Sequence, residues 1–264
     1  MKFALVDGEK VEATKGGKGK CQSCDSEMIT HCGPVYADHW QHKRKYKCDS
    51  WWETETPWQR AWKNYFPKEW QEIRHHDQNT GEVHIADVKT ESGYVLEFQH
   101  SIIKLNERIA RGMFYPKLNW VVDVGSSPRK TDKKQLQKII IDSTTVVRDF
   151  LIRLVVFPDE CRLLRERCNG KDFVFFDCKG AEGFEEQDFW MLFPMGRDGR
   201  VYLSPIFREQ FIKLHQTNTF DEAIKNIVGT INKRIQISNI RITESPLQMA
   251  KRNMANRRKK KFRF

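Results

Sequence analysis

The stretch that decides the fold is "HIADVKTESGYVLEFQHS", residues 84–101. It reads as two β-strands joined by a three-residue loop, Glu91-Ser92-Gly93, in which Gly93 supplies a left-handed backbone conformation. Counting outward from that loop along both strands places Asp87 directly opposite Glu97. Side chains opposed in this way have Cβ atoms roughly 5 Å apart. The sequence therefore predicts a hairpin that holds two carboxylates side by side.

Two explanations of the paired carboxylates follow from their chemistry. Carboxylates this close repel each other, so one of them holds a proton unless a cation lies between them. A hard divalent cation such as Mg²⁺ takes oxygen ligands, polarises a phosphoryl oxygen and lowers the pKa of an attacking water. The alternative is the charged face of an ordinary hairpin, on which Lys89 neutralises Asp87 from the same side of the strand. The spacing alone leaves both open.

The segments around the hairpin predict a defined order of elements. Trp58, Trp62 and Phe66 recur every four residues, which is typical of one face of a helix, and Pro67 helps to end it. Strand patterns, a helical pattern and a further strand pattern follow. The order is helix, three-stranded meander, helix, strand. The three strands of the meander are expected at 69–76, 82–90 and 94–101, the second helix at 102–115 and the last strand at 119–124.

The second half of the chain predicts a mixture of helix and strand. A polar linker at 125–134 precedes an expected long helix over about 135–154. A final helix begins at Thr219, with Glu222 completing a capping box. Three strands are expected between these helices, at 172–177, 188–193 and 200–206. The fold class indicated is therefore α/β.

Residues 1–50 are rich in Cys, His, Lys and Gly. Cys21 and Cys24 form a close pair, and His39 and His42 follow after fourteen intervening residues. Two cysteines and two histidines suit tetrahedral Zn²⁺, which would fold a segment with little core of its own. The substitute ligands are His31, Cys32 and Cys48, and the alternative to a zinc site is a set of ordinary thiols and surface histidines.

The charge of the chain is concentrated in its last fourteen residues. The formal net charge is +11, and residues 251–264 carry eight Lys or Arg and no acid, so 11 − 8 leaves +3 on the rest. This tail is either a solvated end or an arm that seeks phosphates. A long apolar run and a signal-peptide pattern are both missing from the sequence, so we expect no membrane contact and a cytoplasmic protein.

Several motifs in this order resemble the CoiA-like competence nuclease family of the PD-(D/E)xK superfamily. The matching residues are "ETPWQRAWK" (55–63), "HIADV" (84–88), "LEFQHS" (96–101), and Arg111 followed by Phe114 and Tyr115. The cysteine-histidine module matches as well. The resemblance implies a restriction endonuclease-like core. With it, the expected parts are a zinc-binding module at 1–50, the nuclease core at 51–125, an α+β region at 126–250 and the basic tail at 251–264.

The resemblance also implies roles for residues of the hairpin. Asp87 and Glu97 would bind one or two Mg²⁺ or Mn²⁺ ions together with the backbone carbonyl of Phe98. Gln99 stands where the superfamily usually has lysine, a replacement similar to that of this branch. The candidates to assist the attacking water in place of that lysine are Lys89 and Lys63.

On the preceding helix the resemblance assigns Glu55 as an acid that helps to hold the metal or its water. The alternative role for Glu55 is a first-turn acid favoured by the helix dipole. Gln59 stands where family members tend to have histidine, which is a departure from the pattern.

The expected function is a cytoplasmic, metal-dependent nuclease that hydrolyses phosphodiester bonds in DNA. As the resemblance implies, the setting would be competence, recombination or antiviral defence in bacteria, with a helicase, ATPase or recombination protein as partner. The alternative is a non-catalytic nucleic-acid-binding adaptor in which the acids only stabilise the hairpin. For a rival acid-x-lysine pattern, Asp177-Cys178-Lys179, we expect no suitably placed strand with a partner acid before it.

Overall fold

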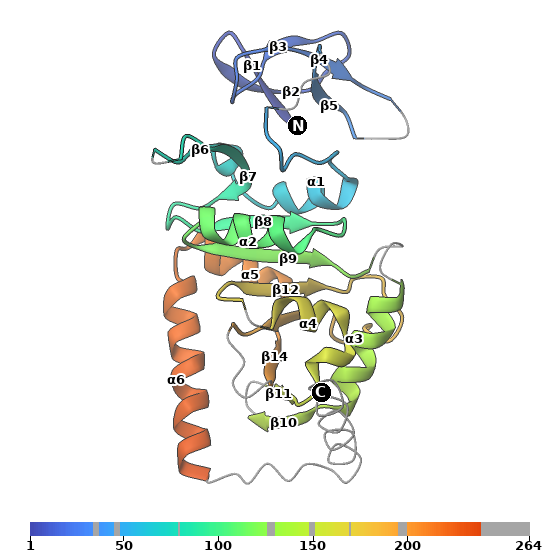
Figure 1. Ribbon diagram of the computed structural model, residues 1–264, viewed down its shortest axis with the longest axis vertical. Helices are drawn as coiled ribbons and strands as arrows, with labels where there is room; N and C mark the ends of the chain where they lie inside the picture. Colours follow the sequence, from blue (N-terminus) through green and yellow to red (C-terminus); the bar gives the residue numbers. More distant parts are fainter. Residues whose placement is uncertain are drawn as a thin grey trace, which may run out of the picture.

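The computed structural model describes residues 1–33, 37–44, 48–78, 80–125, 130–147, 151–168, 170–194 and 200–238. It is a mixed α/β protein with one five-stranded and one nine-stranded sheet among these residues. In Figure 1 the smaller sheet forms one end of the molecule, and the larger sheet and its helices form the rest. No helix among the described residues is long and apolar enough to cross a membrane. The basic tail lies outside the described residues.

The N-terminal sheet has strand order β2-β1-β3-β4-β5. Asp7 and Gly8 both have positive φ, as the tight turn between the first two strands requires. The side chains of Met28 and Trp40 are buried in a small core of its own, so this module contains more regular structure than the sequence indicated. Its strands are β1 (Phe3–Val6), β2 (Glu9–Glu12), β3 (Lys18–Lys20), β4 (Glu27–His31) and β5 (His39–His42).

The expected order of helix, three-stranded meander, helix and strand is present. β6–β7 and β7–β8 pair antiparallel, and the chain then crosses through α2 so that β9 lies parallel to β8. Such a crossover needs a helix or a comparable length of chain. The elements are α1 (Pro57–Lys63), η1 (Lys68–Trp70), β6 (Gln71–His76), β7 (Val83–Lys89), β8 (Val95–Gln99), α2 (Leu105–Phe114) and β9 (Leu118–Asp123).

The register of the β7–β8 hairpin follows from its loop. The amide of Thr90 donates to the Tyr94 carbonyl at 2.8 Å, and Gly93 has a φ of 83°. The pairing continues through Val88 with Leu96. The predicted register is therefore confirmed up to the position just before the two acids.

The second half of the chain extends the same sheet. β12 pairs parallel with β9, so the nine-stranded order β10-β11-β14-β13-β12-β9-β8-β7-β6 runs across the boundary expected at residue 125. The elements are α3 (Lys130–Asp142), β10 (Thr144–Val147), β11 (Ile152–Val155), η3 (Pro158–Glu160), α4 (Arg162–Arg167), β12 (Phe173–Asp177), β13 (Phe189–Leu192), β14 (Val201–Pro205), α5 (Arg208–Gln216) and α6 (Phe220–Ser238).

The long helix expected over 135–154 was wrong beyond Asp142. The residues that follow, Thr144 to Val147, are all β-branched, and they form the edge strand β10. β-Branched side chains lose freedom in a helix and pack well on a pleated sheet. The three strands expected further on are present as β12, β13 and β14.

Candidate active site and candidate metal centre

The two acids of the hairpin line a cavity of about 80 Å³, which we call the carboxylate cavity. It lies where α1, β7 and β8 meet, and Glu55, Lys63, Asp87 and Glu97 all contribute to its wall. A volume of this size holds a few water molecules. The structure thus brings together most of the residues that the sequence assigned to one site.

Each of the two hairpin acids has a partner within the protein. Oδ2 of Asp87 accepts a hydrogen bond from the backbone amide of Phe98 at 2.9 Å. Oε2 of Glu97 lies 2.6 Å from Nη1 of Arg111, a residue of α2. Arg111 also donates to Glu107 and to the carbonyl of Trp51. The α2 helix therefore fixes the carboxylate of Glu97 at the cavity.

Burial shifts the ionisation of both acids. It raises the pKa of Glu97 to about 8, against the attraction of Arg111 and with a further contribution from Asp87. Burial also raises the pKa of Asp87, although Lys63 opposes the shift. A carboxyl group with a raised pKa gains stability from an added proton or an added cation. The cavity is thus a place where extra positive charge is favourable.

Lys63 supplies one buried positive charge from the end of α1. Its Nζ lies 2.5 Å from Glu55, 2.9 Å from Glu72 and 3.9 Å from Oδ1 of Asp87. Burial disfavours its charged form, but Glu72 and Glu55 outweigh burial and raise the pKa of Lys63. Glu55 also pairs with Arg60, so both of these partners are cations of α1. Glu55 itself precedes the N-cap Thr56 and the first turn of α1 contains no acid, so the alternative role of a first-turn acid was wrong.

Glu72 is a cavity residue that the sequence reasoning missed. Its carboxylate accepts the backbone amides of Lys2 and Phe3 at 2.7 and 2.9 Å, and so it joins the N-terminal sheet to the large sheet. The residue has a φ of 49°, which is uncommon for glutamate. No local pattern in "WQEIRHH" distinguishes it from a solvated strand acid, because its partners lie about seventy residues away.

The other assigned residues are placed as follows. Gln99 lines the cavity and accepts a hydrogen bond from Arg167 of α4. The carbonyl of Phe98 accepts from Nε2 of Gln59 at 2.9 Å, and a carbonyl oxygen has a second lone pair. Lys89, expected near the acids, is not among the described residues that line the cavity.

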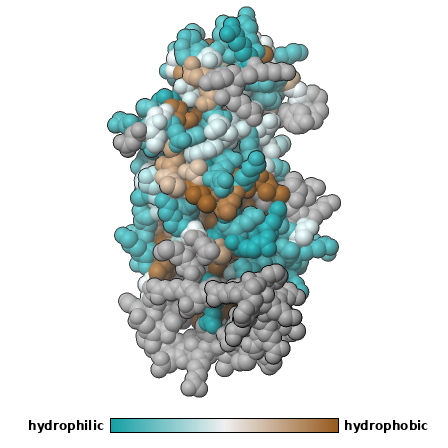
Figure 2. Space-filling model, in the orientation of Figure 1, coloured by the Kyte–Doolittle hydropathy of each residue, from teal (hydrophilic) through white to brown (hydrophobic). Residues whose placement is uncertain are grey.

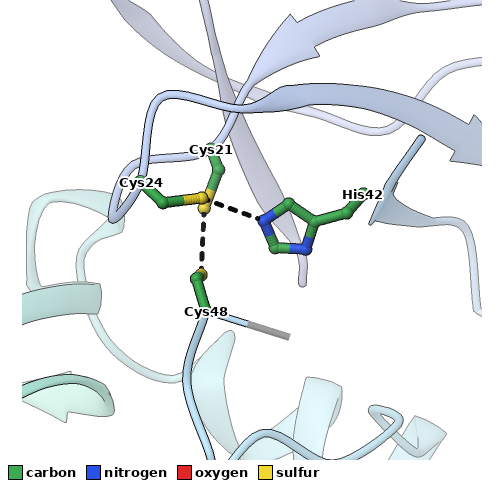
Figure 3. A group of neighbouring side chains, drawn as sticks. All are labelled: Cys21, Cys24, His42 and Cys48. Carbon is green, nitrogen blue, oxygen red and sulfur yellow. Dashed lines mark hydrogen bonds between the residues drawn. The ribbon is translucent and has the colours of Figure 1, made fainter. Parts of the chain in front are cut away.

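A second site lies at the edge of the N-terminal sheet. Figure 3 shows Cys21, Cys24, His42 and Cys48 converging, with their ligand atoms all within 4.8 Å of one another. Cys21 Sγ is 3.6 Å from Cys48 Sγ, and Cys24 Sγ is 3.3 Å from His42 Nε2. Tetrahedral zinc with Zn–S of about 2.3 Å holds two sulfurs about 3.8 Å apart. These four residues can therefore hold a zinc ion.

The ligand set differs from the expected one at a single position. His39 points elsewhere, with Nδ1 at 2.9 Å from the Ala37 carbonyl and its ring stacked on His31. Cys48, one of the substitutes considered, takes the fourth place. On a strand, residues three apart face opposite sides, so His39 and His42 of β5 cannot both reach one ion. The hydrogen bond from Cys48 lowers the pKa of the Cys21 thiol to about 5, which favours the thiolate that binds a metal.

Two further observations limit the choice of site. Among the described residues, Asp87 and Glu97 do not join a group of three or more closely spaced metal-ligating atoms, whereas the four Cys and His residues do. Asp177, of the rival acid-x-lysine pattern, accepts hydrogen bonds from the indoles of Trp58 and Trp62 and pairs with Arg208. Asp177 therefore stabilises the contact of α1 and α5 with the sheet.

Comparison with known proteins indicates no family and no function for this chain. No protein-family model, no curated protein and no solved structure matches this chain. The function is therefore inferred from the geometry of the carboxylate cavity and of the Cys-His cluster.

Proposed function

We propose that the protein is a metal-dependent nuclease that hydrolyses phosphodiester bonds in DNA, with the carboxylate cavity as its active site and a restriction endonuclease-like core as its scaffold. The observation that carries the proposal is the meeting of Asp87, Glu97 and Lys63 at one cavity, on a hairpin and a helix in the order described. The proposal includes membership of the CoiA-like family, which the sequence resembles, and a role in bacterial DNA processing.

The cavity fits a hard divalent cation such as Mg²⁺ or Mn²⁺. Asp87, Glu97 and Phe98 line it, and the proposed donors are the two carboxylates and the Phe98 carbonyl, which are ligands of the kind that such ions take. Burial raises the pKa of Glu97 even though Arg111 lies beside it, so a further cation at this carboxylate would be favourable. When bound, the ion would supply Lewis-acid stabilisation of the phosphoryl oxygen and a more acidic water.

The residues of the chain would hold and orient the reacting groups. The ion pair with Arg111 and the amide of Phe98 fix the carboxylates of Glu97 and Asp87, so little reorganisation is needed when substrate arrives. The ammonium of Lys63 would stabilise negative charge that develops on the phosphate. Gln99 is held by Arg167 and would orient a water rather than remove its proton.

A second function is favoured by one observation. Both acids already have donors within the protein, as they would if their role were only to stabilise the fold. The chain would then be a non-catalytic nucleic-acid-binding or recombination adaptor. The two functions differ in whether the acids are needed for bond cleavage.

The test is cleavage of labelled DNA with Mg²⁺ or Mn²⁺ by the parent and by Asp87→Asn and Glu97→Gln. We expect each variant to lose at least about 10²-fold in rate, because each removes a carboxylate that would bind the proposed metal ion at the reacting centre. Glu82→Gln, an exposed glutamate just before β7, is the matched control and should cleave like the parent. Unchanged rates in both cavity variants would refute the site, and a parent that binds DNA without cleaving it would establish the adaptor.

A further inference from the structure

A groove adjoins the carboxylate cavity on its α2 side. It has a volume of about 650 Å³ and runs between α2, α4 and the segment 170–174, and we call it the α2–α4 groove. Ile103 and Trp120 line both the groove and the cavity. Arg167 of the groove donates to Gln99 of the cavity. The two spaces are therefore neighbours that share a wall.

One side of the groove is an exposed apolar stripe. Leu105, Ile109 and Met113 are spaced four residues apart on α2, and their exposed fractions are 57%, 51% and 78%. Figure 2 shows this hydrophobic surface over α2, with hydrophilic surface beside it on the side of α4. Apolar surface left exposed on a stripe of this kind is typical of a binding site.

The other side of the groove is cationic. Among the described residues that line it, four are Arg or Lys and two are acids. Arg165 and Lys171 are exposed, whereas Arg108 lies 3.8 Å from Glu166. The groove thus presents apolar contact area and positive charge together, next to the proposed reacting centre.

We infer that the α2–α4 groove binds an unpaired stretch of the nucleic-acid strand that enters the carboxylate cavity, with its bases on α2 and its phosphates toward Arg165 and Lys171. The inference rests on the proposed function and adds the substrate class. A strand in the cavity must continue beyond the cut bond, and the groove is the adjoining space. Grooves that bind single strands combine positive charge with apolar, mostly aromatic, surfaces for unstacked bases, and here the aliphatic stripe of α2 would supply that apolar surface. A duplex keeps its base faces stacked and would leave the stripe without a partner.

The test measures binding in buffer without added Mg²⁺ or Mn²⁺, so that affinity is separated from cleavage. The probes are a fluorescent single-stranded DNA oligonucleotide, its duplex and an abasic strand of equal length. We expect the Ile109→Ser, Met113→Ser double variant to bind the single strand about tenfold more weakly, because it removes apolar area that the bases would cover. Ile141→Ser, at a 70% exposed isoleucine of α3, is the control and should bind like the parent.

Two further measurements separate bases from phosphates. The parent should bind the abasic strand about as weakly as the double variant binds the ordinary strand. The double variant Arg165→Gln, Lys171→Gln should have a slope of log K against log salt concentration that is shallower by about 1.4, as expected for two lost phosphate contacts to a single strand. Circular dichroism of each variant checks that the fold is retained.

Three results would overturn the inference: parental affinity in the double variant, preference for duplex, or parental self-association that Ile109→Ser abolishes without changing DNA binding. The last would identify a second copy of the chain as the occupant. Failure of the proposed function looks different, because a parent that cannot cleave would still show groove-dependent binding. If the groove variants cleaved and bound DNA like the parent, the nuclease proposal would stand and the inference about the groove would be refuted.

Discussion

Single residues decide how the two halves of the proposed site are held. Gln59 caps α1, because its Oε1 accepts the amide of Thr56 at 2.9 Å while its amide donates to the Phe98 carbonyl. One side chain thus fixes both the start of a helix and the end of a strand beside the acids. Gln59 stands where members of the resembled family tend to have histidine. Its neutral amide can still position the Phe98 carbonyl, so this departure is compatible with a positioning role.

His215 gives a residue-scale prediction for stability against pH. Its ring stacks on Phe220 with centroids 4.4 Å apart, and its Nε2 lies 3.2 Å from the amide nitrogen of Asn119. Burial lowers its pKa to about 3, so the folded state keeps it neutral where an unfolded chain takes up a proton near pH 6.5. Stability is fully present above that pH and falls as the pH is lowered toward 3, by about 1.4 kcal/mol per unit for this group.

The measurement is urea unfolding between pH 7 and pH 5. His215→Phe should flatten the pH dependence by about one proton, even if it lowers stability at pH 7 through the lost contact with Asn119. His76→Gln, at an exposed histidine of β6, is the control and should keep the parental slope. An unchanged slope in His215→Phe would show that the ring is protonated in the folded state as well.

At the scale of elements, local signals predicted some parts of the fold and not others. The loop ending in Gly93 predicted the β7–β8 register, because a hairpin register follows from its turn. The residues after Asp142 were assigned to a helix, although sheet pairing with β11 makes Thr144–Val147 a strand. The cysteine pair was evident from its spacing, whereas Cys48 and Glu72 act through partners distant in sequence. Tertiary contacts of this kind leave no local pattern.

Gly93 provides the prediction for the hairpin element. A side chain there would meet no atom within 4 Å, so only its φ of 83° opposes substitution. Gly93→Ala should lower the free energy of unfolding by about 1–2 kcal/mol, the cost of a left-handed backbone at a residue with a Cβ. Gly33→Ala, also in open space but without a positive φ, is the control and should change stability little. Equal effects in chemical unfolding of the two variants would contradict the strain argument.

At the scale of the whole molecule, the Cys-His cluster ties the smaller sheet to the chain that leads into the larger one. Cys21, Cys24 and His42 belong to the N-terminal sheet and its turns, and Cys48 lies on the connection to Trp51 and α1. A bound ion would therefore restrain that connection as well as the sheet. The orientation of the two sheets would then depend on metal as well as on Glu72.

Zinc content provides the whole-molecule prediction. Elemental analysis should find about one zinc per chain in the parent and in His39→Ala, but none in Cys48→Ser, because the last removes a thiolate ligand. Removal of the metal by a chelator should lower the melting temperature, since the energy of metal binding contributes to folding. Retained zinc in Cys48→Ser with loss in His39→Ala would restore the ligand set first expected.

The pairing of β9 with β12 has a consequence for how this protein can be divided. The two strands pair along five residues, Asn119 to Asp123 and Phe173 to Asp177, so each satisfies the backbone amides and carbonyls on one flank of the other. A fragment that stopped at residue 125 would leave one entire flank of β9 without bonding partners, and the side chains of that strand are buried throughout. An unpaired strand edge with apolar side chains pairs with the edges of other molecules, and such a fragment would aggregate. The proposed active site and the half of the chain that follows it would thus have to be expressed and purified as one piece.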